Sequence, residues 1–271
     1  QVSLDSLDDA AREAVVRASV FGLSVWDQGL AAVGVSDPSA ALKKLIAAEM
    51  LVEHQQSRFT NCREYLFKHA LVRDVAYTSA GEELRLKLHA LAARWLDAMG
   101  EDAATVAQHF DLGGEHEEAA HHWEVAARRA LATNALREAV TMADRALTFA
   151  DDKPTAFQRA LLLDEAYSRL DGRSSERDSA IRAMAENVFD EASEARTAGA
   201  RARYDDARGS GTHIEETLVD VREKACALDL VDEEARCTAT LAHRYAFAGQ
   251  LPMAESEATH LLYLAEQRGI D

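Results

Sequence analysis

Four histidines lie close together in the chain, and histidine is the commonest metal ligand in proteins. They are His109, His116, His121 and His122. A zinc-protease helix needs His-Glu with a second histidine four positions after the first, but His116-Glu117 is followed by Ala120 at that position. His116 and His121 are five residues apart and so point to different faces of a helix. We expect ordinary surface or groove histidines and no metal site.

Motifs for phosphate chemistry are missing from the sequence. It contains no GxxxxGK[ST] and no Gly-Lys pair, which a P-loop needs to cradle phosphates. The His-Arg-Asp and Asp-Phe-Gly signatures of protein kinases are absent too. Gly209-Ser210-Gly211 joins two helical patterns and is interpreted as a connector. The sequence therefore predicts no catalytic residues and no cofactor bound by this chain.

Charge and composition exclude several classes of function. The net charge of −17 opposes a general nucleic-acid or acidic-membrane surface, which needs clustered Lys and Arg. Residues 1–80 carry ten acidic and eight basic residues, whereas the remainder carries 37 and 22. Hydrophobic residues make up 48% and aromatic residues 6% of a chain rich in alanine, a composition typical of closely packed helices.

Cysteine usage and hydropathy indicate the cellular compartment. Cys62, Cys226 and Cys237 have no CxxC spacing and are odd in number, which indicates reduced thiols. No apolar run approaches the length of a membrane span, and no signal peptide is present. We expect a cytoplasmic protein with no membrane contact. Because the chain begins with Gln1 rather than Met, we interpret it as a piece of a larger protein.

The first part of the chain, residues 1–80, predicts three helices and a β-hairpin. Asp8 or Asp9 begins a helix, a second short helix follows from Trp26 to Val33, and Asp37-Pro38 begins a third. Two strands, near 50–53 and 64–67, flank a polar tip. Three helices followed by a hairpin form a winged-helix arrangement.

Winged helices often bind DNA, which makes a DNA-binding regulator the first alternative function. The basic residues that could contact phosphates are Lys43, Lys44, Arg58 and Arg63. As many acids lie nearby, so the pattern favours a protein-packing role and no nucleic-acid partner.

The second part, residues 81–271, predicts an array of five antiparallel helix pairs. Helical patterns recur with short breaks at a period in the thirties, which is typical of a solenoid. Small residues such as Ala126, Ala127, Ala139 and Ala143 allow two helices to approach closely. From about 102 to 268 the pattern resembles the tetratricopeptide repeat, with an irregular unit around 193–228. The expected fold is all-α with one small β-hairpin: a winged helix followed by an α-α superhelical solenoid.

Such arrays bind partners in a concave groove lined by the first helix of each pair. The positions predicted to face this groove are His121, Glu124, Arg128, Leu161, Glu165, Arg169, Arg236, His243 and Phe247. Repeats that clamp a terminal carboxylate use Lys and Asn there, so that ligand is not supported. The mixed, acid-leaning set predicts a peptide or a partner domain.

The stretch from Phe67 to Tyr77 joins the two parts, running from the last strand into a helix. Together with Ala18–Gly22, and with Leu88-His89 followed by Ala93–Leu96, it resembles the bacterial STAND-type signalling ATPases. In that family a P-loop ATPase precedes a winged helix and tetratricopeptide repeats, and a kinase, cyclase or DNA-binding effector is attached. The resemblance implies that ATP or ADP binds the full-length protein and that this piece lacks both the ATPase and the effector.

The same stretch is similar to the Met-His-Asp segment of immune-receptor ATPases, whose histidine reaches the β-phosphate of ADP. Here His69 is followed by Ala70 instead of Asp. Imidazole can donate a hydrogen bond to phosphate oxygen. The resemblance implies that His69 senses nucleotide in the intact protein; alternatively it ends the strand and bonds locally.

Taken together, the residues and the resemblance predict a non-catalytic regulatory region of a multidomain signalling ATPase. Its partner would be a protein, a peptide, or its own ATPase or effector domain. The other alternative is a non-catalytic part of a Ser/Thr kinase or nucleotide cyclase. The sequence leaves the oligomeric state open.

Overall fold

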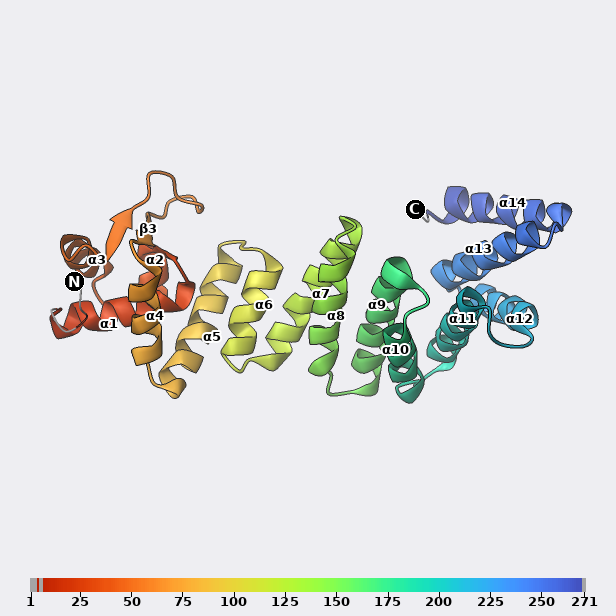
Figure 1. Ribbon diagram of the computed structural model, residues 1–271, viewed down its shortest axis with the longest axis horizontal. Coiled ribbons are helices and arrows are strands. Elements are labelled where there is room, and N and C mark those ends of the chain that lie inside the picture. Colours follow the sequence, from red (N-terminus) through yellow and green to blue (C-terminus); the bar gives the residue numbers. More distant parts are fainter. Residues whose placement is uncertain (1–3, 5–6, 270–271) are drawn as a thin grey trace. The chain divides into compact units, whose positions relative to one another are not determined.

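The computed structural model describes residue 4 and residues 7–269 (Figure 1). The chain divides into two compact units, residues 1–126 and 127–271. It is helical apart from one small sheet, as predicted. No helix in the described part has both the length and the apolar character needed to cross a bilayer.

The first unit begins with helices that start where the capping residues predicted. Helix α1 (Asp9–Ala18) is capped by Asp8, whose carboxylate accepts a hydrogen bond from the Ala11 amide at 2.8 Å. It continues into the 3₁₀ turn η2 (Ser19–Phe21). Helix α3 (Pro38–Ala47) has Asp37 as its cap and proline in its first turn. Between them lies the short helix α2 (Asp27–Ala32).

A three-stranded antiparallel sheet, with strand order β1-β3-β2, completes the small domain. Strands β2 (Leu51–Glu53) and β3 (Glu64–Phe67) form the predicted hairpin, with Leu51 opposite Phe67. Strand β1 (Ser24–Trp26), which the sequence did not predict, pairs with β3. Three residues are too few to show alternating hydrophobicity. Along the chain the order of these elements is helix, strand, helix, helix, strand, strand, and their assignment to a winged helix stays a prediction.

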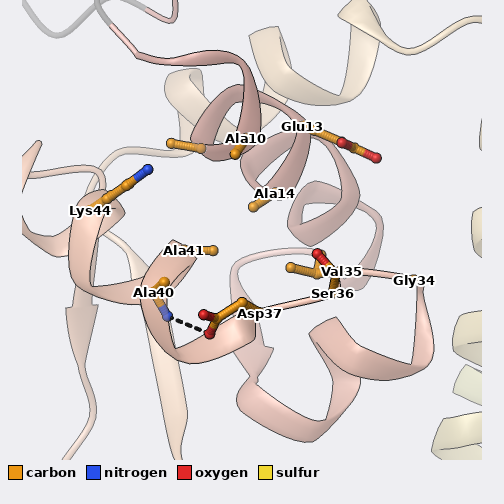
Figure 2. Close-up of a pocket in the computed structure, with 11 residues that line it drawn as sticks. Ala10, Glu13, Ala14, Gly34, Val35, Ser36, Asp37, Ala40, Ala41 and Lys44 are labelled. Carbon is orange, nitrogen blue, oxygen red and sulfur yellow. Dashed lines mark hydrogen bonds between the residues drawn. The ribbon is translucent and has the colours of Figure 1, made fainter.

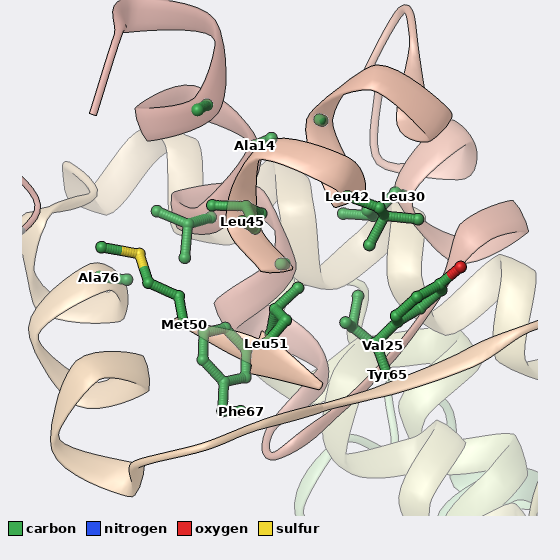
Figure 3. Close-up of a cluster of buried hydrophobic side chains, with 14 of the residues drawn as sticks. Ala14, Val25, Leu30, Leu42, Leu45, Met50, Leu51, Tyr65, Phe67 and Ala76 are labelled. Carbon is green, nitrogen blue, oxygen red and sulfur yellow. The ribbon is translucent and has the colours of Figure 1, made fainter. Parts of the chain in front are cut away.

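Side chains from the helices and all three strands meet in one core (Figure 3). Leu30, Leu45, Met50 and Leu51 are fully buried there. Phe67 and Tyr65 of β3 lie on the same side of the strand and both point into this core. The sheet is therefore held by apolar packing as well as by its ladder hydrogen bonds.

Helix α4 (Ala70–Ser79) follows β3 after two residues, as the sequence predicted for the joint. Helices α5 (Glu82–Ala98) and α6 (Ala103–Leu112) come next. Trp95 of α5 packs against Trp26 and Phe59, with ring centroids 5.5 and 5.4 Å apart. By packing, α5 belongs with the sheet. The predicted domain boundary between residues 80 and 81 stays a prediction.

The second unit contains only helices among its described residues. Its elements are the end of α7 (His116–Ala132), then α8 (Leu136–Thr148), α9 (Lys153–Asp171), α10 (Ser175–Glu186), α11 (Glu191–Arg208), α12 (Ile214–Ala227), α13 (Val231–Phe247) and α14 (Leu251–Arg268). Counted from residue 81 over the described residues, the helices form the five predicted pairs. Ala127, Ala139 and Ala143 are fully buried between helices, as the small-residue pattern predicted. The sequence predicted most of the turns, including those at Asn134, Asp229 and Gly249, which adopt positive φ. The turn at 187–190, between α10 and α11, was not predicted.

The fourth pair, α11 and α12, was the irregular unit in the sequence. Its first helix begins with a capping box, in which Asp190 accepts from the Ser193 amide at 2.7 Å. The linker ends α11 at Gly209 and begins α12 after His213, and both residues are left-handed. The pair is therefore regular in structure although its alanine pattern is not.

Candidate functional site

A pocket of about 270 Å³ opens on the first helices of three successive pairs in the second unit. Helix α9 contributes Glu165 and Arg169, α11 contributes Arg203, and α13 contributes Arg236. The lining is completed by Asp164, Ser168, Arg177 and Ala239. Three of the nine predicted groove residues, Glu165, Arg169 and Arg236, thus line one hollow.

Two arginines of this pocket are buried and paired. Arg177, which is 2% exposed, donates from Nε to the Asp164 carboxylate at 2.8 Å and from Nη1 to the Gly172 carbonyl at 3.1 Å. Arg203 forms a two-point ion pair with Glu233, which is fully buried. Burial opposes the charge on Arg203, but the Glu233 carboxylate outweighs it and raises the guanidinium's pKa. The Arg203 guanidinium therefore stays charged, and the hydrogen bonds of both arginines fix them in the lining of the pocket.

The pair of Arg203 and Glu233 depends on a glycine and also affects a cysteine. Gly199, one turn before Arg203, leaves the space that the Glu233 carboxylate fills. Cys237 lies beside both charged groups, with its Sγ 3.7 Å from Glu233 Oε1. Burial, followed by the nearby carboxylate, raises the pKa of the Cys237 thiol to about 12. This thiol is therefore protonated at neutral pH and a poor nucleophile.

The two outer arginines are less restrained. Arg236 lies 3.3 Å from Glu165 in an ion pair whose side chains are each about one-third exposed. The exposed side chain of Arg169 forms no hydrogen bond or ion pair with the residues that the structure describes. The pocket thus brings four guanidiniums together with the carboxylates of Asp164, Glu165 and the neighbouring Glu233. The sequence predicted an acid-leaning groove, whereas this part of it is rich in arginine.

The other predicted groove residues do not line this pocket. Leu161 packs at the edge of the core around Phe157. On α13, the His243 ring lies tilted against that of Phe247, which is 83% exposed, with centroids 4.6 Å apart. His121, Glu124 and Arg128 lie on α7. The exposed ring of His121 contacts that of His122 at 5.4 Å. Their role in a groove stays a prediction.

Sequence reasoning missed Asp164, Arg177, Arg203 and Glu233. Asp164, Arg177 and Glu233 are buried, and the Arg203 side chain is only 11% exposed. Charged residues are seldom expected at such positions unless they are paired. One signal could have pointed to them: Gly199 lies in the middle of a helix, where glycine is unfavourable unless a neighbour needs the space.

His69 lies at the joint in the first unit and is exposed. It occupies the N-cap position of α4, but its side chain makes no capping hydrogen bond. Its backbone carbonyl accepts from the Val72 amide at 3.0 Å. The alternative was that the imidazole hydrogen-bonds locally. The imidazole nitrogens have no hydrogen-bond partner among the described residues. The ring is therefore accessible to a ligand outside this chain.

Helix α4 is anchored by a buried polar network behind His69. Arg73 donates from Nε to the Ser19 carbonyl at 3.0 Å, and its guanidinium lies over the Tyr77 ring. The Tyr77 hydroxyl is 2.9 Å from Nε2 of His89, whose Nδ1 is 3.2 Å from Nδ1 of His109. This chain of contacts links α4 to α5 and α6.

Both histidines of this network are neutral. Burial, together with nearby His109, Arg73 and Arg85, lowers the pKa of His89 to about 4. Burial, with Arg73, also lowers the pKa of His109 to about 4. In the neutral pair one Nδ1–H donates to the other Nδ1, whereas two protonated rings would place two N–H groups face to face.

Some of the basic residues that could support DNA binding form ion pairs within the first unit. Lys44 pairs with Asp8 at 2.6 Å. Arg58, in the hairpin tip, pairs at 2.6 Å with Glu101, whose side chain is only 1% exposed. Lys43 and Arg63 are exposed. Two of the four cations are thus already neutralised by carboxylates.

A second, smaller hollow of about 140 Å³ lies between α1 and α3 (Figure 2). Alanines, including Ala10, Ala14 and Ala41, form much of its wall. Two of its polar side chains have partners: Asp37 caps α3 through the Ala40 amide, and Lys44 pairs with Asp8. This hollow offers little to fix a ligand. In the described part of the chain, no three His, Cys, Asp or Glu side chains converge as metal ligands.

Comparison with known proteins yields one fold-level similarity. No protein-family model matches the chain, and no curated protein matches it. Among solved structures, it is similar to a signal transduction ATPase with numerous domains (STAND) carrying a tetratricopeptide repeat sensor, from Pyrococcus horikoshii. The match has 12% identity and a TM-score of 0.44, and it covers 99% of this chain and 46% of that protein. These values are too low to assign a family or a function.

Proposed function

We propose that this chain is a non-catalytic, cytoplasmic regulatory region of a larger signalling ATPase. Its repeat groove binds a protein or peptide partner, and its first unit passes that contact to a nucleotide held elsewhere in the parent protein. The observation that carries the proposal is the pocket lined by α9, α11 and α13. A hollow shared by the first helices of successive pairs is the binding geometry that helical repeats use.

The first experiment tests the groove. Random twelve-residue peptides are displayed and selected on the immobilised chain. The blocking variant is Ala239→Trp, because Ala239 is exposed and lines the pocket without belonging to either buried ion pair. The matched control is Ala185→Trp, an exposed position on α10 outside the pocket. We expect enriched peptides whose binding is lost with Ala239→Trp and kept with Ala185→Trp. If no peptide is enriched, the groove function is wrong.

The second experiment tests the switch in the full-length protein. His69→Ala should lower the amount of ADP that remains bound after desalting, because the imidazole would no longer donate to a phosphate oxygen. His54→Ala is the control, since His54 is also exposed and lies in the hairpin. Equal ADP retention in the wild type and in His69→Ala would contradict the role of His69.

The DNA-binding alternative is less well supported, because Lys44 and Arg58 are engaged in ion pairs. The alternative of a kinase or cyclase parent concerns domains outside this chain. It is compatible with the same groove.

A further inference from the structure

We propose that the pocket on α9, α11 and α13 recognises a carboxylate of an acidic peptide, and that Arg169 and Arg236 are the residues that bind it. This inference rests on the proposed groove function and names the chemistry of its ligand. Four observations lead to it: the balance of charge in the pocket, the unused donors at its surface, its size, and its contrast with the rest of the chain.

The charged side chains that line the pocket, together with Glu233, carry one more positive charge than negative charges. Arg177 is neutralised by Asp164, and Arg203 by Glu233. Of the two outer arginines, Arg236 has Glu165 at 3.3 Å, and Arg169 has no carboxylate partner among the described residues. A single carboxylate from a ligand would therefore complete the set of pairs.

The unused donors point to the same ligand. The closest atoms of Arg236 and Glu165 are Nη2 and Oε2, 3.3 Å apart, and neither Nε nor Nη1 of Arg236 has a hydrogen-bond partner in the described chain. None of the guanidinium N–H groups of Arg169 donates a hydrogen bond to a described residue. Guanidinium forks bind carboxylates through two parallel hydrogen bonds, which are among the strongest polar contacts in proteins.

The ion pairs of Arg177 and Arg203 fix the helices that line the pocket. Arg177 and Arg203 tie α10 to α9 and α11 to α13 through buried pairs. Side chains fixed in this way need little ordering when a ligand binds, which lowers the entropic cost of binding. The volume of about 270 Å³ is just below the usual range for whole small molecules and suits one side chain or a chain terminus.

The negative charge of the whole chain influences which acidic peptides can approach the pocket. The chain carries a net charge of −17, so an acidic peptide is repelled at long range. At physiological ionic strength that repulsion is screened beyond about 8 Å, whereas contact with an arginine is not. A peptide with one or two acidic residues in an otherwise neutral sequence is therefore favoured over a polyacidic one.

The test uses the twelve-residue peptides selected on the whole chain. We expect enriched sequences to carry Asp, Glu or a free C-terminus, and the enriched peptide of highest affinity is then titrated by fluorescence anisotropy. Arg169→Gln and Arg236→Gln should each weaken binding about tenfold or more, as loss of a hydrogen bond to a charged group predicts. Arg173→Gln is the control: Arg173 is exposed, in the same unit and outside the pocket. Its affinity should equal that of the wild type.

The source of the carboxylate is separated by a matched peptide pair. Amidating the C-terminus removes binding if the terminus is recognised, and replacing Asp or Glu by Asn or Gln removes it if a side chain is recognised. If peptides bind and are blocked by Ala239→Trp but need no carboxylate, the inference is overturned while the groove function stands. If no peptide is enriched, the groove function fails and the inference fails with it.

Discussion

Gly199 of α11 and Glu233 of α13 pack so closely that a β-carbon at position 199 would overlap the Glu233 carboxylate. The same β-carbon would lie 2.9 Å from Nη1 of Arg203. The glycine thus creates the space in which the buried pair of Arg203 and Glu233 forms.

Replacing Gly199 with Ala should therefore destabilise the protein. In an ordinary helix interior the change would stabilise by about 1 kcal/mol. Here it displaces a buried ion pair, and breaking such a pair costs about 3–5 kcal/mol. We expect a net loss of roughly 2–4 kcal/mol in urea unfolding. In the Glu233→Ala background the same change should cost nothing or stabilise. An equal loss in both backgrounds would exclude the overlap as its cause.

The buried histidines should make the stability of the first unit sensitive to mild acid. His89 and His109 have pKa values of about 4 in the folded protein, below the ordinary value of 6.5. The unfolded chain therefore binds more protons as the pH falls from about 6.5 towards 4, and the free energy of unfolding decreases over that window. Above pH 6.5 this contribution does not change with pH.

Thermal unfolding between pH 7 and pH 4.5 checks this. A His89→Gln, His109→Gln double variant should lose less stability across the window than the wild type does. His69→Ala, which removes an exposed histidine, should keep the wild-type dependence. If the double variant keeps the wild-type slope, the histidine pair is not the source of the acid sensitivity.

Trp95 should be a major stabilising residue of the first unit. Its ring contacts Phe21, Trp26 and Phe59, with centroids between 5.4 and 5.6 Å away, and so joins α5 to the small sheet. Trp95→Ala should cost about 3–5 kcal/mol, as truncation of a large aromatic side chain in a core does. Leu71→Ala, at a position 74% exposed, should stay within about 0.5 kcal/mol of the wild type. Comparable losses for both, measured by urea unfolding, would contradict the packing argument.

In the pair of Asp164 and Arg177, removing one charged side chain should destabilise the protein more than removing both. Both side chains are at most 3% exposed. Asp164→Ala leaves the guanidinium buried without its partner and should cost about 3–5 kcal/mol. An Asp164→Leu, Arg177→Met double variant should recover most of that loss, because neither buried charge remains. If the double variant is as unstable as Asp164→Ala, the loss arises from packing and not from an unpaired charge.

Much of the fold could be predicted because its signals are local. Asp8, Asp37 and Pro38 mark helix starts through hydrogen bonds and φ angles set within a few residues. The breaks at Asn134 and Gly249 mark turns that need positive φ. The strand–helix joint before His69 follows from a change of hydrophobic period.

Other features depended on residues far apart in sequence. The pairing of β1 with β3 brings Ser24 opposite Leu66, and a three-residue strand carries no pattern that names its partner. The outer pair of Glu165 and Arg236 joins α9 to α13. The sequence placed these two residues on groove-facing positions but could not say that they would meet.

The sequence alone thus determined the helical repeats, the hairpin and the positions of their ends, since hydrophobic period and capping act within one or two turns. Only the tertiary structure decided which buried charges neutralise one another. It also decided that Arg169 has no carboxylate partner among the described residues. That choice depends on distances between helices of different pairs, where each buried charge needs a partner. The arginine-rich character of the pocket comes from this non-local pairing, which no single repeat encodes.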